Sequence, residues 1–237
     1  MCTSFVYRRE NVLIGMNFDN NGMKFRISAN QGKGFLVSTE VRGNLYPSFG
    51  VSANGIFVNN LMVDSNGEAP YKRQNDKRWV NSSLVERVLA GDTDLETLRA
   101  QIAQVEIVNG PFMSTHNMIT SGNGDTLVVE PGKKNIYSTA ADTGWYVMTN
   151  FPLSDYGTLT PQNPSGSGAD RYKIAAEYLT LHTGPISVEQ GFDLLREVRQ
   201  YGPEWKTDLS LVYDPKKREV FYLLTEKPET IIPIQLS

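Results

Sequence analysis

Cysteine is almost missing from this sequence. Cys2 is the single cysteine among 237 residues, and only two histidines, His116 and His182, are present. One thiol excludes an intrachain disulfide framework. One cysteine and two distant histidines also supply too few ligands for a zinc site, so we expect neither a metal nor another cofactor. On composition alone, a catalytic pair of Cys2 with His116 stays open.

Long apolar runs and an excess of one charge are lacking as well. No stretch approaches the roughly 18 apolar residues of a membrane-spanning helix. No positively charged segment followed by an apolar one precedes Cys2, as a secretory signal would require. The formal net charge of −3 provides no basic surface for nucleic acid. We therefore expect a soluble, cytoplasmic protein that binds neither membranes nor nucleic acid.

The lone cysteine stands where removal of the initiator methionine makes it the N-terminal residue. The chain would then begin with a thiol of ordinary pKa about 8.5 and an α-amine of pKa about 8 on one residue. A nucleophile with a base on its own Cα needs no separate histidine, which is the arrangement of N-terminal nucleophile hydrolases. The plain alternative is that Cys2 is a small, buried apolar residue.

Apolar periodicity divides the chain into alternating groups of strands and helices. Strands are predicted at residues 3–8, 12–18, 35–41, 55–63, 116–120, 125–130, 136–138, 146–150, 210–213, 220–224 and 231–234. Helices are predicted at residues 80–89, 93–104, 171–181 and 187–200. Thr93 with Glu96, and Ser187 with Gln190, have the spacing of capping boxes.

Pairs of helices between groups of hairpin-linked strands do not suit a parallel sheet. They favour an α+β fold in which helices cover two antiparallel sheets, a four-layer αββα sandwich. The polar segments 64–77 and 158–168 are short enough for surface loops, so we expect a single domain over residues 1–237. N-terminal nucleophile hydrolases share this architecture, although fold alone is only an analogy for function.

Asp19 is the first candidate partner for Cys2. It ends the second predicted strand, and a hairpin between the first two strands brings it back beside Cys2. Its carboxylate can accept a hydrogen bond from the α-amine of an N-terminal cysteine. From the spacing alone, a turn aspartate without a catalytic role is the favoured interpretation.

Several blocks of the sequence resemble the choloylglycine hydrolase family, which includes bile salt hydrolases and penicillin V acylases. The opening Met1-Cys2-Thr3, followed by Gly-Met-Asn-Phe-Asp at residues 15–19, resembles the start of that family. Further similar blocks lie at residues 55–58, 116–117, 124–131, 147–152, 170–176 and 207–213. The blocks keep their order over nearly the whole chain, which is more specific than any one of them.

The resemblance implies roles for four residues. Cys2 corresponds to the nucleophile, and Asp19 to the group that holds its α-amine. Asn150 corresponds to a donor to the oxyanion, and the permanent charge of Arg171 favours the thiolate and the carboxylate. Without the resemblance, Asn150 is a loop asparagine and Arg171 an arginine at a helix start. His116 begins a block in which the family has no catalytic histidine, so its implied role is structural.

Two positions depart from the family pattern. Met16 stands where bile salt hydrolases have an arginine near the nucleophile, so activation of the thiol leans more on Arg171. Met62 aligns with a second oxyanion contact, which is an asparagine or tyrosine in the family. Asn60 is the candidate substitute, because residues 60 and 62 share a face of an extended strand. The chain is also shorter than its family relatives, partly between Asn150 and Arg171.

The function implied by these residues is hydrolysis of a linear, non-peptide amide through an acyl-enzyme on Cys2, with a small-molecule substrate that carries an apolar or steroid-like acyl part. Conjugated bile salts, penicillin V, N-acyl homoserine lactones and N-acyl amines are all open as substrates. Acyl transfer by the same acyl-enzyme is the first alternative. A non-catalytic binding protein is the second, and it follows if Met1 is retained. Assembly into a homo-oligomer is left open.

Overall fold

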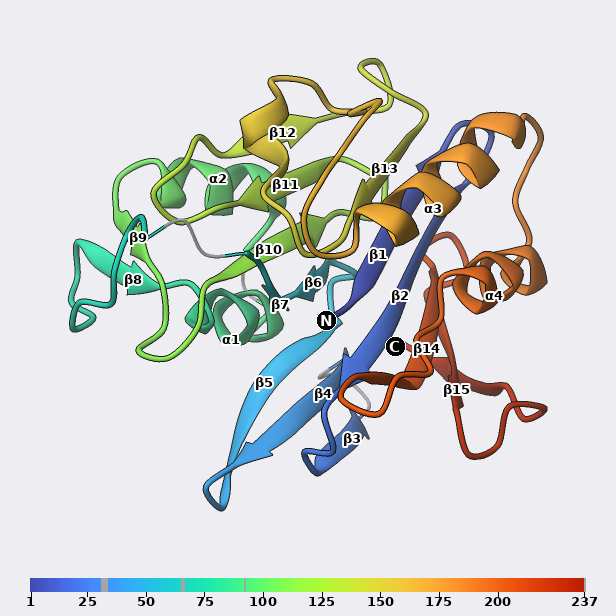
Figure 1. Ribbon diagram of the computed structural model, residues 1–237, viewed down its shortest axis with the longest axis horizontal. Coiled ribbons are helices and arrows are strands. Elements are labelled where there is room, and N and C mark those ends of the chain that lie inside the picture. The colour runs from blue at the N-terminus through green and yellow to red at the C-terminus, as the bar shows by residue number, and fades with distance from the viewer. Residues whose placement is uncertain (31–33, 65–66, 92, 237) are drawn as a thin grey trace.

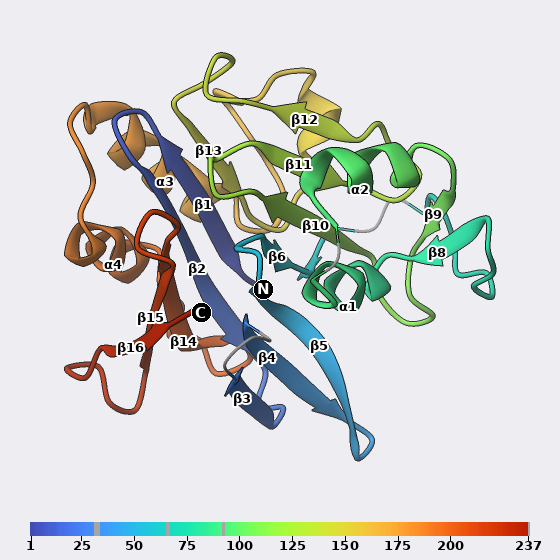
Figure 2. The same cartoon turned by 180° about the vertical axis from the view of Figure 1, so that it is seen from behind.

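The computed structural model describes residues 1–30, 34–64, 67–91 and 93–236. Two antiparallel sheets face each other, and helices lie on the outside of each (Figures 1 and 2). Helices α3 (Ala169–Leu181) and α4 (Val188–Glu197) pack on one sheet, while α1 (Ser83–Leu89) and α2 (Leu95–Ile102) cover the other. The α+β class and the four-layer αββα order predicted from the sequence are confirmed. A small part of the predicted 64–77 loop lies outside the described residues.

The six-stranded sheet carries both ends of the chain. Its strand order is β13–β1–β2–β14–β15–β16, with every neighbouring pair antiparallel. Its strands are β1 (Thr3–Arg8), β2 (Val12–Asn20), β13 (Trp145–Met148), β14 (Lys206–Asp214), β15 (Glu219–Leu224) and β16 (Ile232–Gln235).

The eight-stranded sheet is built from the middle of the chain. Its order is β12–β11–β10–β6–β5–β4–β3, and β7 pairs with β10 outside this path. Its strands are β3 (Phe25–Asn30), β4 (Gly34–Val41), β5 (Asn44–Val51), β6 (Phe57–Asn59), β7 (Leu61–Met62), β10 (Thr115–Thr120), β11 (Thr126–Val129) and β12 (Ile136–Ser138). A separate parallel pair joins β8 (Arg78–Val80) to β9 (Glu106–Val108), and a short 3₁₀ helix, η1 (Leu153–Tyr156), follows β13.

The core has two parts because the eight-stranded sheet is buried on both faces. Between the sheets, Phe18 of β2 lies with its ring centroid 5.3 Å from that of Phe49 of β5. On the opposite face, Val58 and Leu127 pack with apolar residues of α1 and α2. Since the first cluster draws on both sheets and on α3 and α4, we propose that residues 1–237 form the single domain expected. None of the described helices has the length and apolar character that a membrane crossing needs.

Two predicted helix starts are wrong by a few residues. Val80 belongs to β8, where it pairs with Val108, and the helix begins at Ser83. The second helix is capped by Asp94 and not by Thr93, because Asp94 Oδ1 accepts a hydrogen bond of 2.7 Å from the Thr97 amide. The Ser187–Gln190 capping box of α4 is confirmed.

Strands were harder to predict than helices. The predicted strand 55–63 is interrupted at Asn60, so it forms β6 and β7. Strands β3, β5, β8 and β9 were missed. Strand β3 lies at a sheet edge and alternates apolar with polar residues, which is the period of a half-buried strand. Strand β5 contains Pro47, which the ladder accommodates through a register shift opposite Val37 and Ser38.

Candidate active site

Cys2 lies at the open end of β1, directly before the strand begins. Thr3 pairs with Asn17 in the β1–β2 register, and this hairpin brings Cys2 beside Asp19, as the sequence predicted. The Cys2 thiol lies 3.8 Å from the Asp19 carbonyl oxygen, and the Met1 amine donates to the same oxygen at 3.2 Å. The Cys2 side chain is buried. The chain therefore folds its lone thiol and its N-terminal amine into one enclosed position.

Burial shifts both groups toward their neutral forms. It raises the pKa of the Cys2 thiol, and the Asp19 carboxylate adds to the rise, while the amine and Arg171 oppose it. Burial also lowers the pKa of the Met1 amine. With Met1 in place, the thiol is thus held as a protonated, weak nucleophile.

The Asp19 carboxylate is held by three side chains. Thr207 Oγ1 donates to Oδ1 at 2.6 Å, Gln200 Nε2 donates to Oδ2 at 2.6 Å, and Arg171 Nη1 lies 3.4 Å from Oδ2. Burial raises the pKa of this carboxyl, and these donors oppose the rise. The N-terminal amine, which belongs to Met1 here, bonds the Asp19 backbone and not its carboxylate.

A β-bulge in β14 aligns Thr207 with Asp19. Thr207 pairs with Asp19, whereas the next pair along the ladder is Leu209 with Phe18, so Asp208 is an extra residue in β14. Beyond the bulge, Ser210 Oγ donates to Asn17 Oδ1 at 2.6 Å. Both polar pairs therefore lie on the face of the sheet that α3 and α4 cover, since Asn17 also donates to the Leu195 carbonyl of α4.

Arg171 joins the candidate residues into one network. Its Nη1 donates to the Cys2 carbonyl at 2.8 Å and to Thr3 Oγ1 at 2.6 Å, while Nη2 donates to Asn150 Oδ1 at 2.7 Å. The side chain belongs to the first turn of α3 and is buried. Gly168, the N-cap of that helix, has φ of +78°, and a Cβ there would lie 2.6 Å from Arg171 Nη2.

Asn150 follows β13 and has its side-chain orientation fixed at both ends. Its Oδ1 accepts from Arg171, and its Nδ2 donates to the Met62 carbonyl at 2.6 Å. An asparagine amide has two N–H groups, so a second donor is left beside this bond. A neutral donor of this kind can stabilise a developing oxyanion without titrating.

The structure places Asn60 apart from this network. It lies between β6 and β7, and its Oδ1 is 3.5 Å from Nδ2 of both Asn81 and Asn117. These contacts hold the oxygen and leave the Nδ2 group of Asn60 as a donor. The two residues that depart from the family pattern, Met16 and Met62, lie near the candidate site. Met16 is buried in β2 opposite Ser4, and the backbone carbonyl of Met62 accepts a hydrogen bond from Asn150.

Sequence reasoning missed two of the three residues that hold Asp19. Thr207 and Gln200 lie more than 180 positions along the chain from it, so no local pattern connects them. A signal was available in part, because Thr207 opens a block with family resemblance. Among the aromatic residues of the first 75 positions, which could contact an apolar acyl group, Phe35, Phe49 and Phe57 are core residues, whereas Tyr46 and Tyr71 are exposed.

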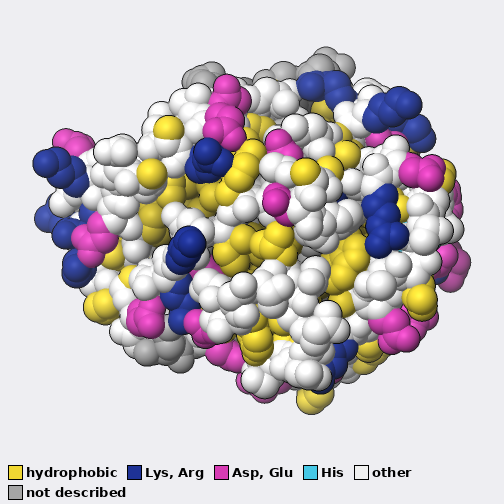
Figure 3. All heavy atoms as spheres, turned by 90° about the horizontal axis from the view of Figure 1, so that it is seen from above, with side chains coloured by type: hydrophobic (Ala, Val, Ile, Leu, Met, Phe, Trp, Pro, Cys, Tyr) yellow, Lys and Arg dark blue, Asp and Glu magenta, His cyan; other side chains and the backbone are white. Residues whose placement is uncertain are grey.

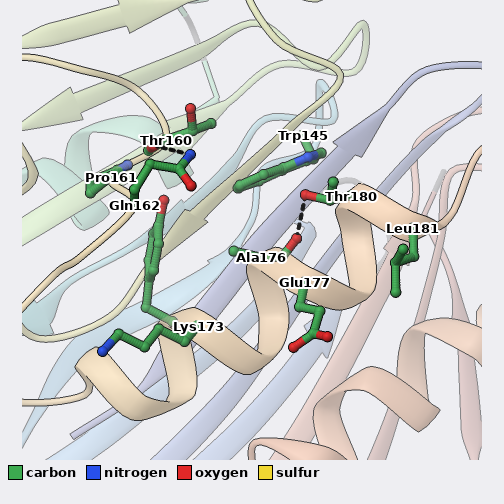
Figure 4. A pocket seen from close by; sticks show the side chains of 10 residues that line it. Trp145, Thr160, Pro161, Gln162, Lys173, Ala176, Glu177, Thr180 and Leu181 are labelled. Carbon is green, nitrogen blue, oxygen red and sulfur yellow. Dashed lines mark hydrogen bonds between the residues drawn. The ribbon is translucent and has the colours of Figure 1, made fainter.

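A groove on the described surface is separate from the Cys2 network. A groove of about 280 Å³ lies between α3, Trp145 and the loop at residues 160–162, and none of the four candidate residues lines it (Figure 4). The face in Figure 3 has apolar side chains in its middle and interspersed Lys, Arg, Asp and Glu around them. Among the described residues, no group of three or more His, Cys, Asp or Glu side chains could hold a metal ion.

Three solved structures of similar architecture complete the description. The C2A mutant of conjugated bile acid hydrolase from Clostridium perfringens matches with a TM-score of 0.76 at 15% identity, covering 100% of this chain and 92% of that one. Penicillin V acylase from Agrobacterium tumefaciens matches with a TM-score of 0.72 at 17% identity, covering 99% and 86%. The Caenorhabditis elegans ortholog of N-acylethanolamine-hydrolyzing acid amidase matches with a TM-score of 0.64 at 14% identity, covering 90% and 93%.

These likenesses establish the N-terminal nucleophile hydrolase fold for this chain. The sequence itself matches no family model and no curated protein. Identities of 14–17% are low, so the similarity lies in the course of the backbone.

Proposed function

We propose that this protein is a cysteine N-terminal nucleophile amidohydrolase that cleaves a linear, non-peptide amide. The observation that carries the proposal is the bonding of Arg171. This one buried guanidinium contacts the Cys2 carbonyl, the Asp19 carboxylate and the Asn150 side chain. The proposed nucleophile, the carboxylate proposed to hold its amine and the proposed oxyanion donor thus share a single hydrogen-bonding partner.

The reaction begins once Met1 is removed and the α-amine belongs to Cys2. The amine takes the thiol proton, and the thiolate attacks the amide carbonyl. Asn150 Nδ2 donates to the oxyanion of the tetrahedral intermediate. The protonated amine then gives its proton to the leaving nitrogen, so that the C–N bond breaks and a thioester on Cys2 remains. Water, deprotonated by the same amine, attacks the thioester and releases the acid.

Asp19 and Asn60 complete the proposed machinery. Removal of Met1 frees space next to the Asp19 carbonyl, where the Met1 amine now bonds. We expect the Cys2 amine then to bond the Asp19 carboxylate, which Thr207 and Gln200 hold in place. Asn60, whose oxygen faces Asn81 and Asn117, is the proposed second oxyanion donor.

The substrate class follows from the proteins of like fold. Their names specify a conjugated bile acid, penicillin V and an N-acylethanolamine, which are all linear amides. We propose a small-molecule amide of this kind, with an apolar acyl group. Acyl transfer is the second candidate, since an amine can replace water in the last step. A chain that keeps Met1 has no free amine on Cys2, and it would be a binding protein only.

The test combines intact mass with activity. We expect the purified protein to lack Met1, to hydrolyse at least one of a panel of chromogenic amides, and to form a covalent acyl adduct on Cys2. Cys2→Ala is expected to abolish turnover, because no other thiol exists in the chain. Wild-type rates in Cys2→Ala, or quantitative retention of Met1 in an active enzyme, would end the proposal. Added amine acceptors in the same assay separate transfer from hydrolysis.

A further inference from the structure

We infer that His116 and Glu130 form a buried pair that positions Asn150 for oxyanion stabilisation, an inference that rests on the proposed function. Neither residue contacts Cys2, Asp19 or Arg171 through any hydrogen bond described above. Both act on the backbone that carries Asn150. They are therefore positioning residues and not catalytic ones.

The pair connects the two sheets at the point where Asn150 leaves β13. His116 lies on β10 and Glu130 directly follows β11, both in the eight-stranded sheet, and both side chains are buried. His116 Nδ1 is 3.3 Å from Glu130 Oε1, and His116 Nε2 is 2.8 Å from the Thr149 carbonyl oxygen. Because a carbonyl only accepts, Nε2 carries a proton and donates it to the residue just before Asn150.

Glu130 binds the chain on the other side of Asn150. Its Oε1 accepts from the Leu153 amide at 2.8 Å, and its Oε2 accepts from the Ser154 amide at 3.1 Å and from the Ser154 hydroxyl. The pair thus holds a carbonyl one position before Asn150 and two amides three and four positions after it. Rotation of the intervening turn would break these bonds.

The ionisation of Glu130 favours the hydrogen bonds that hold the backbone around Asn150. Burial would raise the pKa of Glu130, but hydrogen bonds from His116, Ser154 and the Leu153 amide outweigh it, and the pKa lies below the ordinary value. With Nε2–H donated to Thr149, the ring is oriented so that Nδ1 faces Glu130 Oε1. The pair therefore fixes the direction of each of its bonds to the backbone around Asn150.

Position matters greatly at this residue. A donor to an oxyanion acts only when it is aimed at the site where charge develops, and a misplacement of about 1 Å can cost about 10²-fold in rate. The side chain of Asn150 is held by Arg171 and Met62, but those bonds do not fix its backbone. The Asp64 amide bonds the Asn150 carbonyl at 2.8 Å, and His116 and Glu130 hold the residues on either side of Asn150.

The test uses variants that keep the shape of the pair. Glu130→Gln and His116→Gln are expected to lower kcat about 10-fold to 10²-fold toward an amide that the wild type hydrolyses, with KM little changed. If Glu130 acts through Asn150, then Glu130→Gln adds no further loss to an Asn150→Ala background. Ser138→Ala is the matched control, because it removes a buried hydroxyl that bonds Arg8 and leaves the 149–154 turn untouched.

Hydrogen exchange separates this inference from the proposed function. In Glu130→Gln, peptides that cover residues 149–156 should exchange faster than in the wild type, and in Ser138→Ala they should not. Unchanged exchange there, unchanged kcat, or losses that add fully in the double variant would each overturn the inference. If the wild type is inactive toward every amide, the proposed function is wrong, and so is the catalytic role of the His116–Glu130 pair. The exchange experiment still tests whether the pair holds the backbone around Asn150.

Discussion

Two buried arginines serve opposite ends of β1 and differ in what they bind. Arg8 closes the strand, and its guanidinium donates to the carbonyls of Gly124, Ser138 and Thr143 and to the Ser138 hydroxyl. Its carbonyl and hydroxyl acceptors are neutral, and burial lowers the pKa of Arg8. It joins the ends of the two sheets, since β1 and β12 belong to different ones.

Arg171 lies at the other end of β1, and most of its N–H groups donate to side chains instead of backbone carbonyls. It bonds one backbone carbonyl, at Cys2, and otherwise a hydroxyl, an amide oxygen and a carboxylate of side chains. Both arginines are almost fully buried, with exposed fractions of 2% for Arg8 and 5% for Arg171. Burial therefore does not distinguish Arg8 from Arg171, for which we propose a role in catalysis, whereas the side chains that each arginine binds do distinguish them.

Exchange of each arginine for glutamine is expected to give the sharpest contrast. Arg171→Gln should lower kcat/KM by about 10²–10³, because Asn150 loses the bond that orients its amide. Arg8→Gln should leave kcat of the folded enzyme near the wild-type value and lower the free energy of unfolding, since each buried acceptor left unpaired costs about 1–3 kcal/mol. Steady-state kinetics and urea unfolding measure the two effects. Equal losses of kcat in both variants would show that the comparison is wrong.

A glycine with positive φ lies against each arginine, so alanine substitutions at the two glycines also compare the two arginines, with smaller expected effects. Gly124 has φ of +88°, and a Cβ there would lie 2.9 Å from Arg8 Cβ, whereas a Cβ on Gly168 would lie 2.6 Å from Arg171 Nη2. Both alanine variants carry a backbone penalty of about 1 kcal/mol or more. Only Gly168→Ala should also lower kcat, by about 10-fold, because it displaces the group that bonds Asn150. A similar fall in kcat for Gly124→Ala would contradict this.

The smallest expected difference is in the pH dependence of stability. The pKa of Asp19 is raised by burial above its ordinary 3.8, in spite of Arg171. Folding therefore favours the protonated carboxyl, and this contribution is complete below pH 3.8 and is lost as pH rises through the higher pKa of the folded state. Asp19→Asn should remove that part of the slope, whereas Arg8→Gln should keep it. Urea unfolding at a series of pH values between 3.5 and 7 provides the measurement, and identical slopes in wild type and Asp19→Asn would contradict the prediction.

The sequence allowed the layers of the fold to be predicted because its helices and most buried strands have clear periodicity. The failures have local causes. Val80 was assigned to a helix because apolar spacing alone does not reveal its pairing with Val108. Strand β5 was missed because Pro47 and Gly50 are unfavourable in a strand, and only the register shift beside Pro47 makes room for it.

For the site, the hairpin alone was sufficient to bring Asp19 beside Cys2. The meeting of Asn150 and Arg171 with them depends on long-range packing, and it was expected only through family resemblance. Gln200 and Thr207 were missed because their bonds to Asp19 span most of the chain. The role of His116 and Glu130 was equally out of reach, since it lies in bonds to backbone groups that no residue pattern specifies.

The bulge at Asp208 sets a limit on how this chain can change in length. Asn17 and Asp19 are two residues apart on β2, while their hydrogen-bonding partners Ser210 and Thr207 are three apart on β14. The surplus residue reconciles these two counts. A chain shortened by one residue here can satisfy either the pair next to the thiol or the pair under α4, but not both. Surface loops can gain or lose residues freely, whereas the number of residues between Thr207 and Ser210 in β14 decides whether both hydrogen-bonded pairs can form.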